Sequence, residues 1–347
     1  MHYSRRSMAD LPKIGLDIGT TTIKAVELTP VGKGWKLLPA VLTPAVGEVT
    51  AGMAVADVGR MSATLSAMIK EGGIKSRKVV VALPEEQVSS HVVELPLLKD
   101  AEIGQALEWQ VEQYIPIPKD QAVWSWEVVR RDEVGGGMEV LLVAAAKNLV
   151  ETYRKIVEGA GLELLAVETE LAAGVRSQLS ETSPLAVVVD IGSGSTDIGV
   201  ARAGQLIFSR TIPTAWQAFV RAVETTLEMD KTQAQQYVNT YGFAADQLEG
   251  KVAAAMLPVL AIIVTEIRKT IDFHISKHPG ETAKLVVLSG GAAKVPEIVG
   301  VLAAQLGVET SIGDPLAKLD VDEQQKKAFA ENAPLYAVAI GLAQRRI

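Results

Sequence analysis

Two stretches of the chain decide its fold, and they resemble each other. The first is Gly15-Leu-Asp-Ile-Gly-Thr-Thr-Thr-Ile-Lys-Ala-Val26. The second is Val189-Asp-Ile-Gly-Ser-Gly-Ser-Thr-Asp-Ile-Gly-Val200, which we align with one extra residue in its turn. Each stretch predicts a strand, an Asp-Ile-Gly turn followed by hydroxyl side chains, and a second strand. Because the stretches lie about half a chain apart, they predict two lobes built on one plan.

The repeated turn is typical of phosphate binding. Glycine lets the backbone approach a phosphate without a Cβ in the way, and the N–H groups of a turn can point at the phosphate oxygens. Asp17 and Asp190 end their strands, where they could hold the water ligands of a Mg²⁺ ion. The cofactor-binding residues that we expect in the two stretches are Gly19, Thr20, Thr21, Thr22, Lys24, Gly192, Ser193, Gly194, Ser195 and Thr196.

A third motif lies nearer the end of the chain. Leu285-Val-Val-Leu-Ser-Gly-Gly291, followed by Pro296, predicts a buried strand that ends in two glycines before a helix. A flat base or sugar can pack on such exposed backbone. We therefore add Gly290 and Gly291 to the expected nucleotide site.

In this order and spacing, the three motifs resemble the phosphate-one, phosphate-two and adenosine motifs of the actin-like ATPase superfamily, which includes actin, MreB, FtsA, sugar kinases and chaperone ATPases. The resemblance covers nearly the whole chain from Ile14. It implies an α/β, two-lobed actin-like ATPase fold with ATP and Mg²⁺ between the lobes, and an inserted FtsA-type α+β module.

The expected division of the chain follows the motifs. It has a disordered leader (1–12), a first lobe (13–78, 166–184 and 320–347), the inserted α+β module (79–165), a second lobe core (185–213 and 284–319) and a helical subdomain of the second lobe (214–283).

Two further strings point to one branch of the superfamily. Glu108-Trp-Gln-Val-Glu-Gln-Tyr-Ile-Pro-Ile-Pro118 and Ala333-Pro-Leu-Tyr-Ala-Val-Ala-Ile-Gly-Leu-Ala343 look like the inserted-module signature and the C-terminal helix of the PilM-like pilus assembly proteins. This resemblance implies an ATP-binding scaffold that docks the N-terminal tail of the inner-membrane protein PilN and couples the inner-membrane platform to the pilus motor. It also implies a cytoplasmic protein, peripheral at the inner membrane through its partners, with other pilus components and a homo-oligomer as further possible contacts.

Some site residues rest on the superfamily resemblance and have a plainer alternative. Glu170 aligns with the residue that orients the attacking water, or else is an acidic residue favoured by a helix N-terminus. Glu266 and Lys269 align near adenosine, or else form an ordinary exposed helix pair.

The chain departs from its relatives after the second phosphate motif. Ile212-Pro-Thr-Ala-Trp216 stands where FtsA-like and PilM-like sequences usually show two glycines. The added bulk indicates weak or absent ATPase activity. Two alternatives stay open: a small-molecule kinase of the same superfamily, for which we find no substrate-side carboxylate motif, and an FtsA-like filament former, for which the chain shows no C-terminal tether.

Composition narrows the function classes. The 347 residues include 34 basic and 41 acidic side chains, a formal net charge of −7 that disfavours nucleic acid and anionic lipid as partners. There is no cysteine, and the histidine pair His274/His278 is interpreted as a partly buried His274 and a solvated His278 rather than a metal site. The long uncharged stretch Val252–Thr265 is still too short for a bilayer and predicts a buried amphipathic helix.

Overall fold

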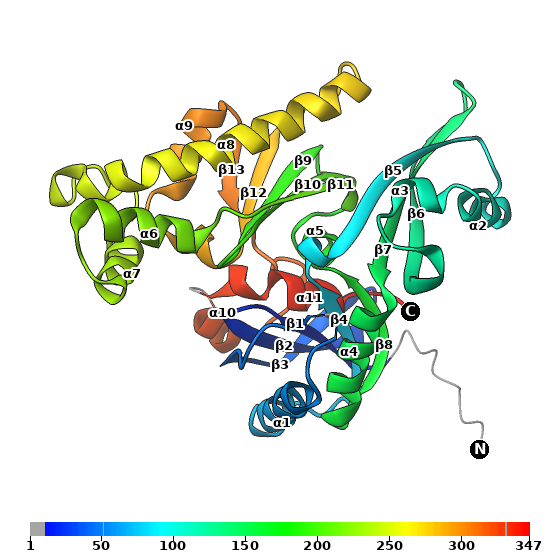
Figure 1. The fold of residues 1–347 in the computed structure, drawn as a ribbon, viewed down its shortest axis with the longest axis horizontal. Coiled ribbons are helices and arrows are strands. Elements are labelled where there is room, and N and C mark those ends of the chain that lie inside the picture. Colours follow the sequence, from blue (N-terminus) through cyan, green and yellow to red (C-terminus); the bar gives the residue numbers. More distant parts are fainter. Residues whose placement is uncertain (1–10, 51, 330–331) are drawn as a thin grey trace.

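A computed structural model describes residues 11–50, 52–329 and 332–347, so residues 1–10 of the expected leader lie outside the described residues. Two sheets, each covered by helices, form two lobes, and a smaller three-stranded sheet lies beside both of them (Figure 1). The described chain ends close to the first lobe, where the C-terminal helix packs.

The first lobe is built on a six-stranded sheet. In spatial order the strands are β14 (Leu319–Asp320), β3 (Gly34–Pro44), β2 (Thr22–Val31), β1 (Lys13–Ile18), β4 (Lys78–Leu83) and β8 (Glu163–Thr169). Helices α1 (Val55–Glu71) and α4 (Lys147–Gly159) cover one face and bury the apolar side chains of β1 and β4. The short helix α10 (Glu323–Phe329) follows β14.

The second lobe repeats the same plan. Its sheet has the order β11 (Gln205–Ile212), β10 (Thr196–Arg202), β9 (Ala186–Ile191), β12 (Leu285–Ser289) and β13 (Glu309–Ile312). The antiparallel hairpin β9–β10 with its parallel neighbour β12 matches the hairpin β1–β2 with its parallel neighbour β4. The helices of this lobe are α6 (Trp216–Leu227), α7 (Lys231–Thr240), α8 (Lys251–Lys277) and α9 (Ile298–Leu306).

Helix α8 with the turn before it is long and apolar enough to cross a membrane by length and composition. However, Val252, Met256, Leu260, Ile263 and Ile267 are buried in the core of the second lobe, against α6 and the sheet. The prediction of a buried core helix is therefore confirmed.

Two helices lie between the sheets. Helix α5 (Glu170–Gln178) packs on the second sheet, and α11 (Ala337–Ala343) packs on β1 and β2 and against α5. These contacts are very close: a Cβ built on Gly15 in β1 would lie 1.8 Å from the carbonyl oxygen of Ala339, and one on Gly341 would lie 1.8 Å from that of Ala173. Glycine at these two positions lets α11 pack closely on β1 and on α5, and this packing connects the two lobes.

The inserted module is smaller than expected. Its sheet contains β5 (Val88–Pro96), β7 (Gly137–Ala146) and β6 (Ala122–Asp132), with α2 (Asp100–Glu108) and α3 (Val111–Tyr114) packed on it. The expected boundaries 79–165 are too wide, because β4 pairs with β1 and β8, and α4 packs against α1 in the first lobe. A buried strand such as β4 has the same apolar sequence pattern whether it belongs to the module or to the first lobe, so the pattern could not decide between them.

The close approach of β1 and α11 predicts the effect of a small substitution. We expect Gly15→Ala to lower the free energy of unfolding by about 3 kcal/mol, because the new methyl group overlaps backbone that cannot move aside easily. Urea denaturation measures this. The control is Gly59→Ala at an exposed position of α1, where nothing lies within 4 Å and where alanine should stabilise by up to about 1 kcal/mol. Equal unfolding midpoints for the two variants would contradict the packing described.

Candidate nucleotide site

A cavity of about 510 Å³ lies between the lobes and is lined by the turns of both hairpins. This volume is within the usual range for small-molecule sites, roughly 300–1,000 Å³. The residues expected from sequence that line it are Asp17, Gly19, Thr20, Thr21, Thr22, Lys24, Glu170, Asp190, Gly192, Ser193, Gly194, Ser195, Gly290 and Gly291.

The two turns have the same geometry. The N–H of Gly19 donates to the carbonyl oxygen of Thr22 at 3.1 Å, and the N–H of Gly192 donates to that of Ser195 at 3.0 Å. Asp17 lies across from Lys24 and Asp190 from Asp197, so the turns also have equal length. The extra residue that we placed in the second turn is therefore wrong, since strand pairing aligns the aspartates and glycines without a gap.

The segment that begins at Ile212, where relatives usually have two glycines, leads into backbone that hydrogen-bonds to the second turn. The N–H groups of Trp216 and Gln217 donate to the carbonyl oxygens of Gly192 and Ser193, at 3.3 and 3.0 Å. The Gln217 Nε2 also donates to the Ser193 hydroxyl at 3.0 Å. Trp216 lines the cavity and also packs against the apolar core of the second lobe, so this chain combines a firmly held turn with a bulkier residue beside it.

Carboxylates from both lobes converge on the cavity. Burial, and then the charges of Asp17, Asp197 and Asp190, raise the pKa of Glu170 well above its usual range. Burial also raises the pKa of Asp190, although the Ser289 hydroxyl donates to its Oδ2 at 2.8 Å. So much unfavourable negative charge in one place is typical of a site that binds a cation.

Lys24 offsets part of this charge. Its Nζ lies 2.9 Å from Asp17 Oδ2, and although burial lowers its pKa, the charges of Asp17, Asp190 and Glu170 raise it above the usual value. The second oxygen of Asp17, Oδ1, is buried without a hydrogen-bond partner among the described residues. The donor set, carboxylate oxygens with one of them unpaired, fits a hard divalent cation such as Mg²⁺.

The third motif forms the far wall. Gly290 has a positive φ of 79°, and a Cβ there would lie 2.5 Å from Asp190 Oδ1. Only glycine fits between the strand end of β12 and the aspartate of β9. Gly290 and Gly291 therefore present bare backbone to the cavity, as expected for packing against a base or sugar.

Three predicted residues lie apart from the cavity lining. Thr196 is fully buried and its hydroxyl donates to the carbonyl oxygen of Thr214 at 2.6 Å. Glu266 of α8 forms ion pairs with Arg210 of β11 and with Lys269 of α8, both at 2.7 Å. For Glu266 and Lys269 this geometry supports the alternative of a helix surface pair and does not support contact with ribose or base.

Several residues that line the cavity were not predicted from the sequence. Tyr153 of α4 is fully buried with its hydroxyl unpaired among the described residues, and burial raises its pKa well above the usual value. Gln235 and Asn239 of α7 also line the cavity. An aromatic residue on a helix face and two amides give no sequence signal for a ligand. Asp197 lies in the second motif at the position that Lys24 has in the first, so an alignment without a gap would have predicted it.

Glu85 links the cavity to the inserted module. It begins the short turn (Glu85–Gln87) that leads from β4 into β5, and its Oε1 accepts a hydrogen bond from the N–H of Leu171 at 3.1 Å. Its own N–H faces Glu170 Oε2 at 3.4 Å. Burial raises the pKa of Glu85 to about 7, although hydrogen bonds from Thr169, Leu171 and Ser209 oppose this shift.

The buried Glu85 predicts a pH-dependent stability. Between its ordinary pKa of 4.5 and about 7, the folded state keeps the proton that the unfolded state loses, so stability falls as pH rises through this window. At about 1.4 kcal/mol per pKa unit, Glu85→Gln should remove up to about 3 kcal/mol of this fall. Thermal melts from pH 5 to pH 8 measure the difference. The control is Glu86→Gln at the exposed neighbouring position, and parallel curves for Glu85→Gln and the unsubstituted protein would contradict the burial cost.

Comparison with known proteins agrees with the fold. Among curated proteins, cell division protein FtsA of Bacillus subtilis (strain 168) is 22% identical over 247 residues, which are 59% of this chain and 54% of FtsA. The chain thus matches about half the length of this relative.

Solved structures cover nearly all of the chain. A PilM–PilN type IV pilus biogenesis complex has a TM-score of 0.82 at 24% identity, over 96% of this chain and 98% of that one. EutJ of Carboxydothermus hydrogenoformans has a TM-score of 0.59 at 17% identity, over 96% and 89%. An MreB protein of Spiroplasma citri bound to ADP has a TM-score of 0.54 at 14% identity, over 96% and 95%. The predicted actin-like fold is confirmed.

The sequence also matches the family described as type IV pilus assembly protein PilM, over residues 15–347. This match includes both hairpin turns, the inserted module and the C-terminal helix. The chain therefore belongs to the PilM family of type IV pilus assembly proteins.

Proposed function

We propose that the chain binds ATP with Mg²⁺ between its lobes and serves as a scaffold in type IV pilus assembly. The observation that carries this proposal is the lining of one cavity by two equivalent Asp-Ile-Gly turns, one from each lobe. A ligand with several phosphates can touch both turns at once. Nucleotides bound to an MreB protein of the same fold add support.

Different lining residues would contact different parts of the nucleotide. The turns at Gly19–Thr21 and Gly192–Ser195 would face the phosphates, and Gly290–Gly291 would face the adenosine. Asp17 and Asp190 would hold Mg²⁺, mainly through its water ligands. When bound, the metal supplies positive charge that neutralises phosphate oxygens and the surrounding carboxylates.

Weak or absent hydrolysis fits the electrostatics of Glu170. A general base must be ionised to accept a proton from water, whereas burial and neighbouring carboxylates favour the protonated form of Glu170. Trp216, at the place of the usual glycine pair, also lines the cavity beside the second turn. We propose Glu170 as the residue that faces the water, in a site that retains nucleotide rather than turning it over rapidly.

We propose that the partner is the N-terminal tail of a PilN-like inner-membrane protein. A solved structure of the same fold is a complex of PilM with PilN, which supports this choice. The tail would hold the chain at the cytoplasmic face of the inner membrane and let it couple the membrane platform to the pilus motor. Nucleotide would then act by setting the relation of the two lobes.

Removing a metal-binding carboxylate should separate metal binding from nucleotide binding. We expect Asp190→Asn to weaken ATP binding at least about tenfold with Mg²⁺ present, a loss of about 1.4 kcal/mol, and to change it little in EDTA. Calorimetric titration with ATP measures both. The control is Asp314→Asn, an exposed position away from the cavity. If Mg²⁺ makes no difference to ATP binding by the unsubstituted protein, the proposed metal role is wrong.

The partner proposal has its own test. A synthetic peptide with the N-terminal sequence of PilN from the same organism should bind with micromolar affinity, typical of a short peptide in a groove, and its scrambled version should not. Calorimetry with and without Mg²⁺ and ATP measures this. Absence of binding under both conditions would rule out the PilN tail as partner and leave the nucleotide site standing.

A further inference from the structure

The inserted module is connected covalently to the first lobe, but its strands pack against the second lobe. Its strands leave the first lobe after β4 and return to it at α4. However, β5 and β6 lie beside β11, the edge strand of the second sheet. Val129 and Leu141 of the module share an apolar cluster with Leu206 and Ile207 of β11.

In the described part of the chain, the apolar contacts of the module with the first-lobe core lie at the ends of the module strands, and Lys147 Nζ of α4 donates to the carbonyl oxygen of Asp120 just before β6. Val88, Ala145 and Ala146 pack against the first-lobe core at the points where the chain enters and leaves the module. The contact with β11 instead lies further along the strands, where Gln205 Nε2 of β11 donates to the carbonyl oxygen of Val128 at 3.0 Å.

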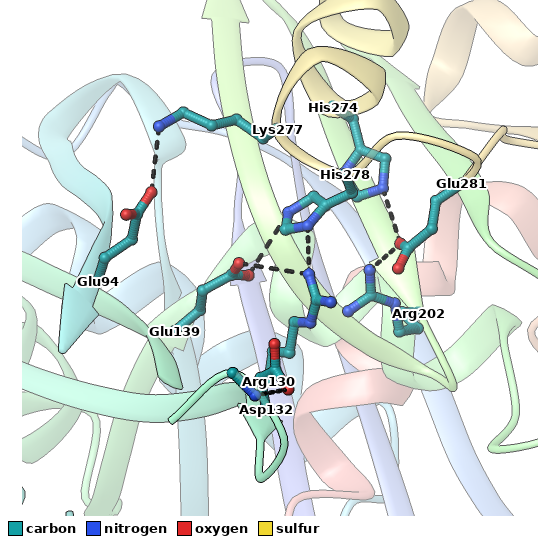
Figure 2. Close-up of polar contacts among 10 residues, drawn as sticks. Glu94, Arg130, Asp132, Glu139, Arg202, His274, Lys277, His278 and Glu281 are labelled. Carbon is teal, nitrogen blue, oxygen red and sulfur yellow. Dashed lines mark hydrogen bonds and ion pairs between the residues drawn. The ribbon is translucent and has the colours of Figure 1, made fainter. Parts of the chain in front are cut away.

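A polar cluster strengthens the contact with the second lobe (Figure 2). Arg130 of β6 donates from Nη1 to Nδ1 of His278, at the end of α8, at 2.5 Å. The other ring nitrogen of His278, Nε2, lies 3.5 Å from Glu139 Oε2 of β7, and Arg130 lies 3.7 Å from Glu139 Oε1. We call Arg130, Glu139 and His278 the latch.

The protonation of the latch follows from its partners. Arginine can only donate, so Nδ1 of His278 accepts and the proton lies on Nε2, which faces the Glu139 carboxylate. The side chain of His278 is only 10% exposed. The prediction of a solvated His278 is therefore wrong, because the module covers this side chain.

Neighbouring residues add further contacts around the latch. The ring of His274 lies against that of His278, with centroids 4.7 Å apart, and its Nε2 is 3.3 Å from Glu281 Oε2. Glu281 in turn pairs with Arg202 at the end of β10. Nearby, Lys277 Nζ lies 3.1 Å from Glu94 Oε1 of β5, a second link between α8 and the module.

We propose that the latch makes the inserted module move with the second lobe, although the chain inserts it into the first. If nucleotide changes the angle between the lobes, a consequence that rests on the proposed function, the module then turns relative to the first lobe. The bends fall where Pro84–Val88 and Ala146 connect the module to its lobe. A surface between module and first lobe would open or close with nucleotide.

The chain has no cysteine, so spin labels can be placed without altering native thiols. Glu133→Cys labels the module, Thr225→Cys the second lobe and Glu71→Cys the first lobe, all at exposed positions. Pulsed electron paramagnetic resonance on pairs of labels measures the distances. In the otherwise unsubstituted protein, we expect Mg²⁺ and ATP to change the 71–133 distance and to leave the 133–225 distance unchanged.

Breaking the latch should loosen the module. We expect Arg130→Gln, and independently His278→Gln, to widen the 133–225 distance distribution about twofold without nucleotide, because the module gains freedom against the second lobe. The matched control is Arg131→Gln, since Arg131 pairs with Asp100 inside the module. The control should leave the width unchanged.

Two results would overturn the latch: a 133–225 width that is the same in all variants, or a 133–225 distance that follows nucleotide while 71–133 stays constant. Failure of ATP to bind has a different meaning. It would contradict the proposed function, whereas the nucleotide-free comparison of Arg130→Gln with Arg131→Gln would still decide the latch.

Discussion

Buried carboxylates from two lobes face one another across a single cavity, and the rest of the arrangement depends on how their charge is balanced. Asp17 and Asp190 end equivalent strands, and Glu170 begins the helix that packs between the sheets. Without a cation these groups repel one another, which favours protonation of Glu170 and Asp190. Lys24 balances part of the charge from the first lobe. A divalent cation would balance more of it and draw the lobes together.

The same arrangement explains how an acidic protein can take an anionic ligand. The turns offer backbone to the phosphates, and the carboxylates offer a place for a metal that carries the positive charge. Lys24 is the one cationic side chain among the described residues that line the cavity. Nucleotide binding of this kind needs few basic side chains, so a net charge of −7 does not oppose it.

Local signals in the sequence predicted most of the cavity. Asp17, Gly19, Asp190, Gly192 and Gly290 lie in short motifs whose residue types are dictated by strand ends and tight turns. Residues brought in by tertiary packing carried no such signal, and Tyr153 is an example: it belongs to a helix whose other buried side chains are core. Glu266 was expected near adenosine from the resemblance alone, whereas its side chain pairs with Arg210 on a neighbouring strand, outside the described cavity lining.

The position of the inserted module was the least predictable part of the fold. Arg130 and His278 are 148 residues apart in sequence, and no local pattern in either segment refers to the other. Their contact exists because β11 is the free edge of the second sheet and the module strands lie beside it. Sequence periodicity predicts strands and helices, but which edge a small sheet packs against depends on the whole fold.

The proposed function requires that both Asp-Ile-Gly turns contact one nucleotide. A crystal structure of the chain with a non-hydrolysable ATP analogue and Mg²⁺ tests this directly. We expect the phosphates between the turns at Gly19–Thr21 and Gly192–Ser195, with the metal beside Asp17 and Asp190. A phosphate position filled by the Trp216 indole, or a nucleotide that touches one lobe only, would contradict it.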